Sequence, residues 1–123
     1  MVTTAFPITD EELGETVNIF FLQGDPALAE GYRLKLELDG YQVTVASPSD
    51  VALENLRAQP PDIIFLDASL RAPGSTRLLR SLRDHPATQR VPVVVLSTRT
   101  PGELAMDGMN LGPLDYVVAA RSV

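Results

Sequence analysis

The sequence contains no cysteine, which excludes disulfide bonds, thiolate catalysis and cysteine-based zinc sites. It also lacks any apolar run that approaches the roughly 18 residues of a membrane-spanning helix. The first residues carry neither a basic stretch nor a long apolar core, so we expect no secretory signal among them. We therefore expect a cytoplasmic protein that makes no contact with a membrane.

Positive charge is also scarce, because 10 lysines and arginines face 16 aspartates and glutamates, for a formal net charge of −6. This sign opposes binding to nucleic-acid phosphates, and we expect no nucleic-acid contact by this domain alone. The single histidine, His85, lies in a polar stretch that ends in proline. We interpret it as a solvated loop residue, neither a phosphodonor nor a metal ligand.

At 123 residues with 45% hydrophobic composition, the chain is long enough for one compact domain and too short for two. Apolar runs alternate with helix-like segments, a pattern that predicts an α/β fold with a parallel sheet. Asp25-Pro26 supplies a helix N-cap followed by proline, and Asp39-Gly40 supplies a helix end. The predicted strands cover residues 17–22, 41–45, 62–66, 91–96 and 116–118, and the last predicted helix covers 101–111.

The most informative residue is Asp67, which follows the apolar run Ile63-Ile64-Phe65-Leu66 and begins the loop after the third predicted strand. In open parallel sheets, ligands collect at the carboxyl ends of the strands. A carboxylate at this edge is placed for chemistry or for binding, although a loop cap is the simpler interpretation.

Several segments together resemble the receiver domain of response regulators, from residue 17 to about 121. The resemblance implies a flavodoxin-like three-layer sandwich, with a five-stranded parallel sheet in the order 2-1-3-4-5. The segments that carry it, in chain order, are Asp25-Pro26, Asp39-Gly40-Tyr41-Gln42-Val43, Pro61-Asp62-Ile63-Ile64-Phe65-Leu66-Asp67, Val91-Pro92-Val93-Val94-Val95-Leu96-Ser97 and Leu111-Gly112-Pro113-Leu114-Asp115-Tyr116.

The resemblance also implies a chemistry, in which an aspartate accepts a phosphoryl group from a phosphohistidine donor with the help of Mg²⁺. Asp67 matches the acceptor, Ser97 the hydroxyl residue that binds the phosphoryl oxygens, and Tyr116 the aromatic switch. Two blander interpretations stay open: Ser97 satisfies backbone groups, and Tyr116 packs in the core.

The sequence departs from the family pattern where cations are needed. Gln23 and Gly24 replace the two carboxylates that hold Mg²⁺, and Ala119 replaces the phosphate-binding lysine. Asp67 and Asp25 could retain a weak Mg²⁺ site, but we expect Asp25 to cap a helix instead. No cofactor site is predicted. Arg71, in the loop after Asp67, could pair with that carboxylate or be solvated.

The two ends of the chain suggest how the domain is organised. We expect an N-terminal extension over residues 1–16 and a receiver-like domain over 17–123 that lacks the family's final helix. Truncation, a helical turn in the N-terminal segment or a second subunit could account for the uncovered flank. Such a flank favours a homodimer through the strand five and helix four face.

The leading hypothesis is therefore an atypical receiver that binds a histidine kinase or another signalling protein and is not an enzyme. One alternative is a conventional receiver phosphorylated on Asp67. Another is a flavodoxin-like domain for a small ligand, although Gln23-Gly24-Asp25-Pro26 does not form a glycine-rich phosphate loop.

Overall fold

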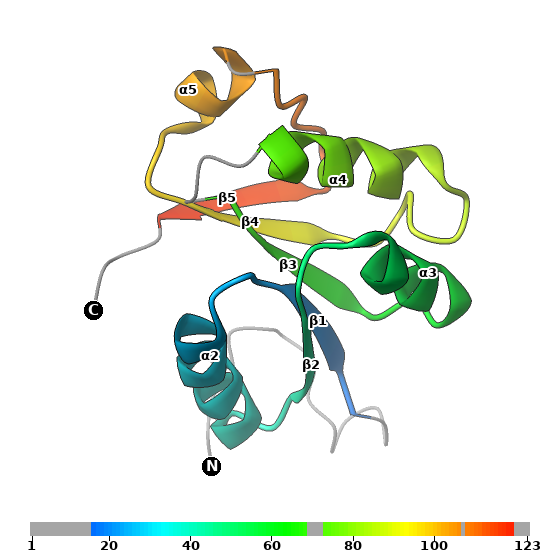
Figure 1. Ribbon diagram of the computed structural model, residues 1–123, viewed down its shortest axis with the longest axis vertical. Helices are drawn as coiled ribbons and strands as arrows, with labels where there is room; N and C mark the ends of the chain where they lie inside the picture. Colours follow the sequence, from blue (N-terminus) through cyan, green and yellow to red (C-terminus); the bar gives the residue numbers. More distant parts are fainter. Residues whose placement is uncertain (1–15, 69–72, 107, 120–123) are drawn as a thin grey trace.

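The fold is a five-stranded parallel sheet between two layers of helices, seen in a computed structural model that describes residues 16–68, 73–106 and 108–119 (Figure 1). The strand order is β2-β1-β3-β4-β5, which confirms the predicted topology. Of the predicted N-terminal extension, residues 1–15 lie outside the described residues. The strands are β1 (Asn18–Leu22), β2 (Gln42–Ala46), β3 (Ile63–Asp67), β4 (Val93–Ser97) and β5 (Asp115–Ala119).

Helices cover both faces of the sheet, as its strands require, since every buried residue of β1 and β3 except Asp67 is apolar. Tyr32 and Leu36 of α2 pack against the core cluster that contains Phe21 and Phe65. The other three helices place their buried leucines in the second core cluster, on the opposite face. The helices are α2 (Pro26–Leu38), α3 (Asp50–Ala58), α4 (Pro73–Asp84) and α5 (Pro101–Met106).

Local signals in the sequence set the ends of these helices. Ser49 caps α3 by accepting a hydrogen bond from the amide of Ala52 at 3.2 Å. Gly40, just after α2, has φ of 99°, a conformation that glycine adopts without steric cost. Within the described residues, none of the helices combines the length and apolar character that crossing a bilayer requires.

The predicted strand boundaries differ from the observed ones by one or two residues, and two boundaries, one of a strand and one of a helix, need correction in detail. The third strand extends to Asp67, which is its last residue and not a loop residue, because the ladder to β4 continues to the pair Asp67 and Leu96. The last helix ends at Met106 and not at Leu111, since Gly108 adopts φ of 94°, outside the helical region.

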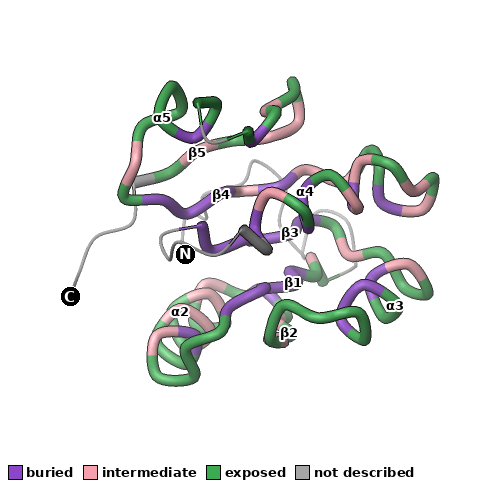
Figure 2. The backbone as a smooth tube through the Cα atoms, turned by 45° about the horizontal axis from the view of Figure 1, so that its top comes forward, coloured by how far each residue is buried: buried purple, intermediate pink, exposed green. Residues whose placement is uncertain are grey.

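Burial falls from the middle of the sheet towards β5 (Figure 2). Strand β5 pairs with β4 alone among the described strands, so it is an edge strand. Its Tyr116 and Val118 are 52% and 46% exposed, and both point to the face that α2 covers at the other end of the sheet. The predicted exposed strip on strand five is thus present in the described residues.

Candidate functional site

The candidate site lies at the carboxyl ends of β1 and β3, which are neighbours in the sheet. Phe21 pairs with Phe65 and Leu22 with Leu66, so the next pair outward is Gln23 and Asp67. Phe21 and Phe65 contact each other in an edge-to-face arrangement, with ring centroids 5.7 Å apart. The strand register therefore brings Gln23 and Asp67 together, each two positions after one of these aromatic residues and on the same face of the sheet.

Gln23 and Asp67 are hydrogen-bonded through their side chains. The Nε2 group of Gln23 donates to Oδ2 of Asp67, and the two residues are only 3% and 8% exposed. The other end of the amide, Oε1, accepts from the backbone N–H of Asp25 at 3.0 Å. We call these two hydrogen bonds the Gln23 bridge. A carboxylate so deeply buried is costly unless donors reach it, and the amide supplies one.

Asp25 is the N-cap of α2, as predicted. Its Oδ1 accepts from the backbone N–H groups of Ala27 at 3.0 Å and Leu28 at 3.3 Å. These bonds satisfy donors that the first helical turn leaves without intrahelical partners. The carboxylate of Asp25 is therefore engaged in the helix cap.

The residues around Asp67 do not fit the Mg²⁺ site that the resemblance implies. Gly24 has no side chain to offer, Asp25 caps the helix, and Gln23 directs its amide donor at Asp67. Over the described ranges, no three histidine, aspartate or glutamate side chains gather closely enough to hold a metal ion. Mg²⁺ requires oxygen ligands, and an N–H donor is not one.

The main chain of Asp67 is tied to two further elements. Its carbonyl accepts a hydrogen bond from the hydroxyl of Ser75 at 3.2 Å, and Ser75 is a buried residue in the first turn of α4. The next residue, Ala68, donates its N–H to the carbonyl of Leu96 on β4 at 2.7 Å. The end of β3 is thus held by β1, β4 and α4. Sequence reasoning did not identify Ser75, and no motif marks it.

Ser97 ends β4 beside this site and is 1% exposed. Asp67 is in register with Leu96, the residue before Ser97. The hydroxyl of Ser97 accepts from the backbone N–H of Arg99 at 2.9 Å, which confirms the prediction that it satisfies a backbone group. Ser97 is in register with Ala119, the position at which the resemblance expects a lysine.

Tyr116 does not pack in the core, so that prediction is wrong. It pairs with Val94 and is 52% exposed, because β5 is an edge strand and the described helices leave this part of the sheet face open. It lies three positions before Ala119, which pairs with Ser97, at a distance of about 10 Å along the strand. Its role as a switch stays a prediction.

His85 lies in the loop that leads from α4 into β4, at the amino ends of the strands, whereas Asp67 lies at the carboxyl ends. Its Nδ1 accepts from the backbone N–H of Ala87 at 3.1 Å, so the ring stabilises a local turn. The position agrees with a loop role away from the site, although the residue is half-buried and not fully solvated. Arg71, the other charged residue considered near Asp67, lies outside the described residues.

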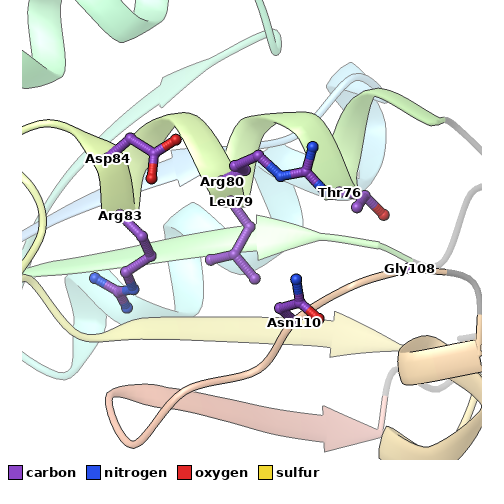
Figure 3. Close-up of a pocket in the computed structure, with 7 residues that line it drawn as sticks. All are labelled: Thr76, Leu79, Arg80, Arg83, Asp84, Gly108 and Asn110. Atoms are coloured by element: carbon purple, nitrogen blue, oxygen red, sulfur yellow. The ribbon is translucent and has the colours of Figure 1, made fainter.

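A second polar cluster, which the sequence did not predict, surrounds Arg83 near the end of α4. The guanidinium bonds Oδ1 of Asp115 and the backbone carbonyl of Val91, the latter at 2.7 Å. Beside it, a cavity of about 270 Å³ separates α4 from the segment after α5 (Figure 3). Its lining consists of Thr76, Leu79, Arg80, Arg83, Asp84, Gly108 and Asn110, and includes none of the predicted site residues.

Comparison with known proteins places these features in context. A family model described as the response regulator receiver domain matches residues 19–119. The chain is 33% identical over 105 residues to the transcriptional regulatory protein CseB of Streptomyces coelicolor, covering 85% of this chain and 44% of CseB. It is 32% identical over 100 residues to the phosphate regulon transcriptional regulatory protein PhoB of Rhizobium meliloti, covering 81% and 44%. The chain thus spans less than half the length of these relatives.

Solved structures give the same result. The N-terminal domain of a response regulator receiver protein from Methanoculleus marisnigri JR1 is similar with a TM-score of 0.69 at 26% identity, over 85% of each chain. The receiver domain of a signal transduction histidine kinase from Syntrophus aciditrophicus has a TM-score of 0.73 at 22% identity, over 88% of this chain and 81% of its own. This second likeness is one of fold alone.

Proposed function

The chain belongs to the response regulator receiver domain family, and on this premise we propose that it acts in two-component signalling mainly through protein contacts. In this proposal, Mg²⁺-dependent phosphorylation of Asp67 contributes little to signalling. The observation that carries it is that the described residues after β1 offer no carboxylate for a metal beside Asp67, since Gly24 has no side chain and Asp25 caps α2. Ala119 adds no cation where the family has a lysine.

The physical argument concerns charge. Transfer of a phosphoryl group to a carboxylate brings two anions together, and nearby cations stabilise the charge in the transition state. The carboxylate of Asp67 receives an amide N–H from Gln23, which is a weaker substitute for Mg²⁺ and a lysine. Phosphorylation of Asp67 should therefore be slow.

The exposed apolar residues support a role in binding other proteins. Tyr116 and Val118 on β5 are about half exposed, and Met106 at the end of α5 is 88% exposed. Both elements lie at the same end of the sheet (Figures 1 and 2). Exposed apolar residues of this kind mark interaction surfaces. We propose a cytoplasmic partner, either a histidine kinase or another signalling protein, and a homodimer through the β5 and α5 face.

A conventional receiver is the second candidate. It is favoured by the position of Asp67 at the end of β3 and by the buried hydroxyl of Ser97 on the neighbouring strand. A flavodoxin-like ligand domain is favoured by no observation in the described residues, and a copurifying flavin or nucleotide would be its evidence.

Intact mass after incubation with acetyl phosphate, with and without Mg²⁺, separates the first two candidates. We expect no phosphoryl adduct on the wild-type chain, while a receiver with the full acid pair and lysine is labelled in parallel. An adduct that the Asp67→Asn variant loses would establish the conventional receiver. A triple variant, Gln23→Asp, Gly24→Asp and Ala119→Lys, should gain labelling. The Gly24 change is sterically mild, because a Cβ built on Gly24 meets no atom within 4 Å.

A further inference from the structure

The side chain of Gln23 joins two parts of the site, the acceptor carboxylate and the loop after β1. We infer that its carboxamide holds the site together in place of a divalent cation, so that the architecture of the site is independent of metal. This inference rests on the proposed function and extends it, because it assigns a structural role to Gln23, which the sequence resemblance marks only as a departure from the family pattern.

The polarity of the Gln23 bridge fits its two partners. Asp67 presents a carboxylate oxygen and receives the N–H of the amide, while Asp25 presents a backbone N–H and meets the carbonyl of the amide. Rotating the amide by half a turn would place oxygen against oxygen and N–H against N–H. The network therefore defines the orientation of the amide. A carboxylate at position 23 could not serve Asp67, since it has no donor.

Burial makes the bridge energetically important. Gln23 is 3% exposed and Asp67 is 8% exposed, so water gives little help to either side chain. A hydrogen bond to an ionised group is roughly twice as strong as one between neutral groups. A second carboxylate at this position would instead repel Asp67, and a cation would be needed to relieve the repulsion. The amide removes that need, because it stabilises Asp67 without bringing any charge.

The backbone connects the bridge to the rest of the fold. The N–H of Gln23 donates to the carbonyl of Ala46 on β2 at 3.1 Å, and the carbonyl of Asp67 accepts from Ser75 of α4. The bridge therefore lies between the end of β2 on one side and the first turn of α4 on the other. Loss of the bridge should loosen the start of the loop that leads to the α2 cap, which includes the N–H of Asp25.

Thermal unfolding of three proteins tests the inference: the wild type, Gln23→Glu and Gln23→Met. Each is measured at about pH 8, in millimolar MgCl₂ and in NaCl of equal ionic strength. Glutamate keeps the shape of glutamine and removes the donor. Methionine keeps the length and removes both hydrogen bonds without adding charge, so it is the matched control.

We expect the wild type to show the same midpoint in both salts. Gln23→Glu should unfold at a lower temperature in NaCl and recover about 5 °C in MgCl₂, because a pair of carboxylates can bind Mg²⁺ together with waters. Gln23→Met should be destabilised equally in both salts. A Gln23→Glu protein that shows no Mg²⁺ response would overturn the inference, because the amide would then not stand in for a cation. So would a Gln23→Met protein as stable as the wild type.

A second measurement covers the case in which Gln23→Glu does not fold in NaCl. Hydrogen exchange of the Asp25 amide should be faster in Gln23→Met than in the wild type by at least about tenfold, because its acceptor is removed. Unchanged exchange would contradict the bridge. The outcomes also separate the two proposals: a phosphoryl adduct on the wild type refutes the proposed function, whereas a missing adduct with an intact Gln23→Met midpoint refutes only the bridge.

Discussion

Replacing Arg83 with alanine should destabilise the fold by about 3 kcal/mol, because it leaves a buried carboxylate without its cation. The side chain of Asp115 is 1% exposed, and its two oxygens have separate partners. Oδ1 accepts from Nε of Arg83 at 3.1 Å and also from Nη2 of Arg83. Oδ2 accepts from the backbone N–H of Gly112 at 2.7 Å. The change to alanine removes the bonds from Arg83 to Oδ1 and keeps the bond from Gly112 to Oδ2.

The magnitude follows from the burial of the pair. Breaking a buried pair by removal of one partner typically costs about 3–5 kcal/mol. The side chain of Arg83 is 21% exposed, so water can reach part of the vacated volume, and the lower end of that range applies. The carbonyls of Val91 and Leu114 also lose a donor. For a domain of this size, about 3 kcal/mol corresponds to a fall of roughly 12 °C in the midpoint of thermal unfolding.

Arg33→Ala is the matched control, since Arg33 also forms ion pairs, in its case with two carboxylates. It pairs with Glu30 and Glu37 along the surface of α2, where each partner is partly exposed. Ion pairs of that kind contribute little to stability, and we expect no measurable loss. Urea unfolding followed by circular dichroism compares the two variants at equal protein concentration.

A double-mutant cycle isolates the pair itself. Arg83→Ala, Asp115→Ala and the double variant should show a coupling energy of at least about 1.5 kcal/mol, because each single change removes the same contact. The reasoning is refuted if Arg83→Ala is no less stable than Arg33→Ala, or if the coupling energy is close to zero.

Two further predictions concern helix caps. Asp25→Ala should lower the free energy of unfolding by about 1 kcal/mol through loss of the α2 cap, whereas Asp39→Ala at the other end of α2 should not lower it; equal losses in urea unfolding would contradict the cap. At α5, hydrogen bonds from the backbone and side chain of Thr100 lower the pKa of Glu103 below 4.5. The stabilisation is then complete above that unfolded value and is lost as pH falls through the folded pKa. The difference in unfolding midpoint between wild type and Glu103→Gln should be present at neutral pH and disappear as the pH falls through the folded pKa, and a constant difference would contradict the assignment.

The order of elements could be predicted because the signals for it are local. A strand buried on both faces is a continuous apolar run, and the run from Ile63 to Leu66 is an example. Helix starts follow from side chains that bond the first turn, as Asp25 does for α2. Boundaries were less exact: β3 includes Asp67, and α5 ends before Gly108, whose backbone conformation the sequence does not state.

The contacts that define the site could be predicted only in part. Gln23 and Asp67 are 44 positions apart, and Arg83 and Asp115 are 32 apart, so both contacts depend on which strands and helices are neighbours. Once the order of the sheet is assumed, the register of β1 and β3 places Gln23 beside Asp67, and this signal was available. No comparable signal exists for Arg83. Tyr116 was misassigned to the core because its apolar neighbours resemble those of a covered strand.

Strand β5 lies at the edge of the sheet, so only a few contacts hold it in place. Strands β1 and β3 each have a neighbour on both sides, whereas β5 is held by the ladder to β4 and by the bonds of Asp115. A strand with one ladder opens locally at a lower free energy than a strand with two. A partner that covers Tyr116 and Val118 would therefore also reduce the opening of β5, and part of its binding energy would be spent on ordering that strand.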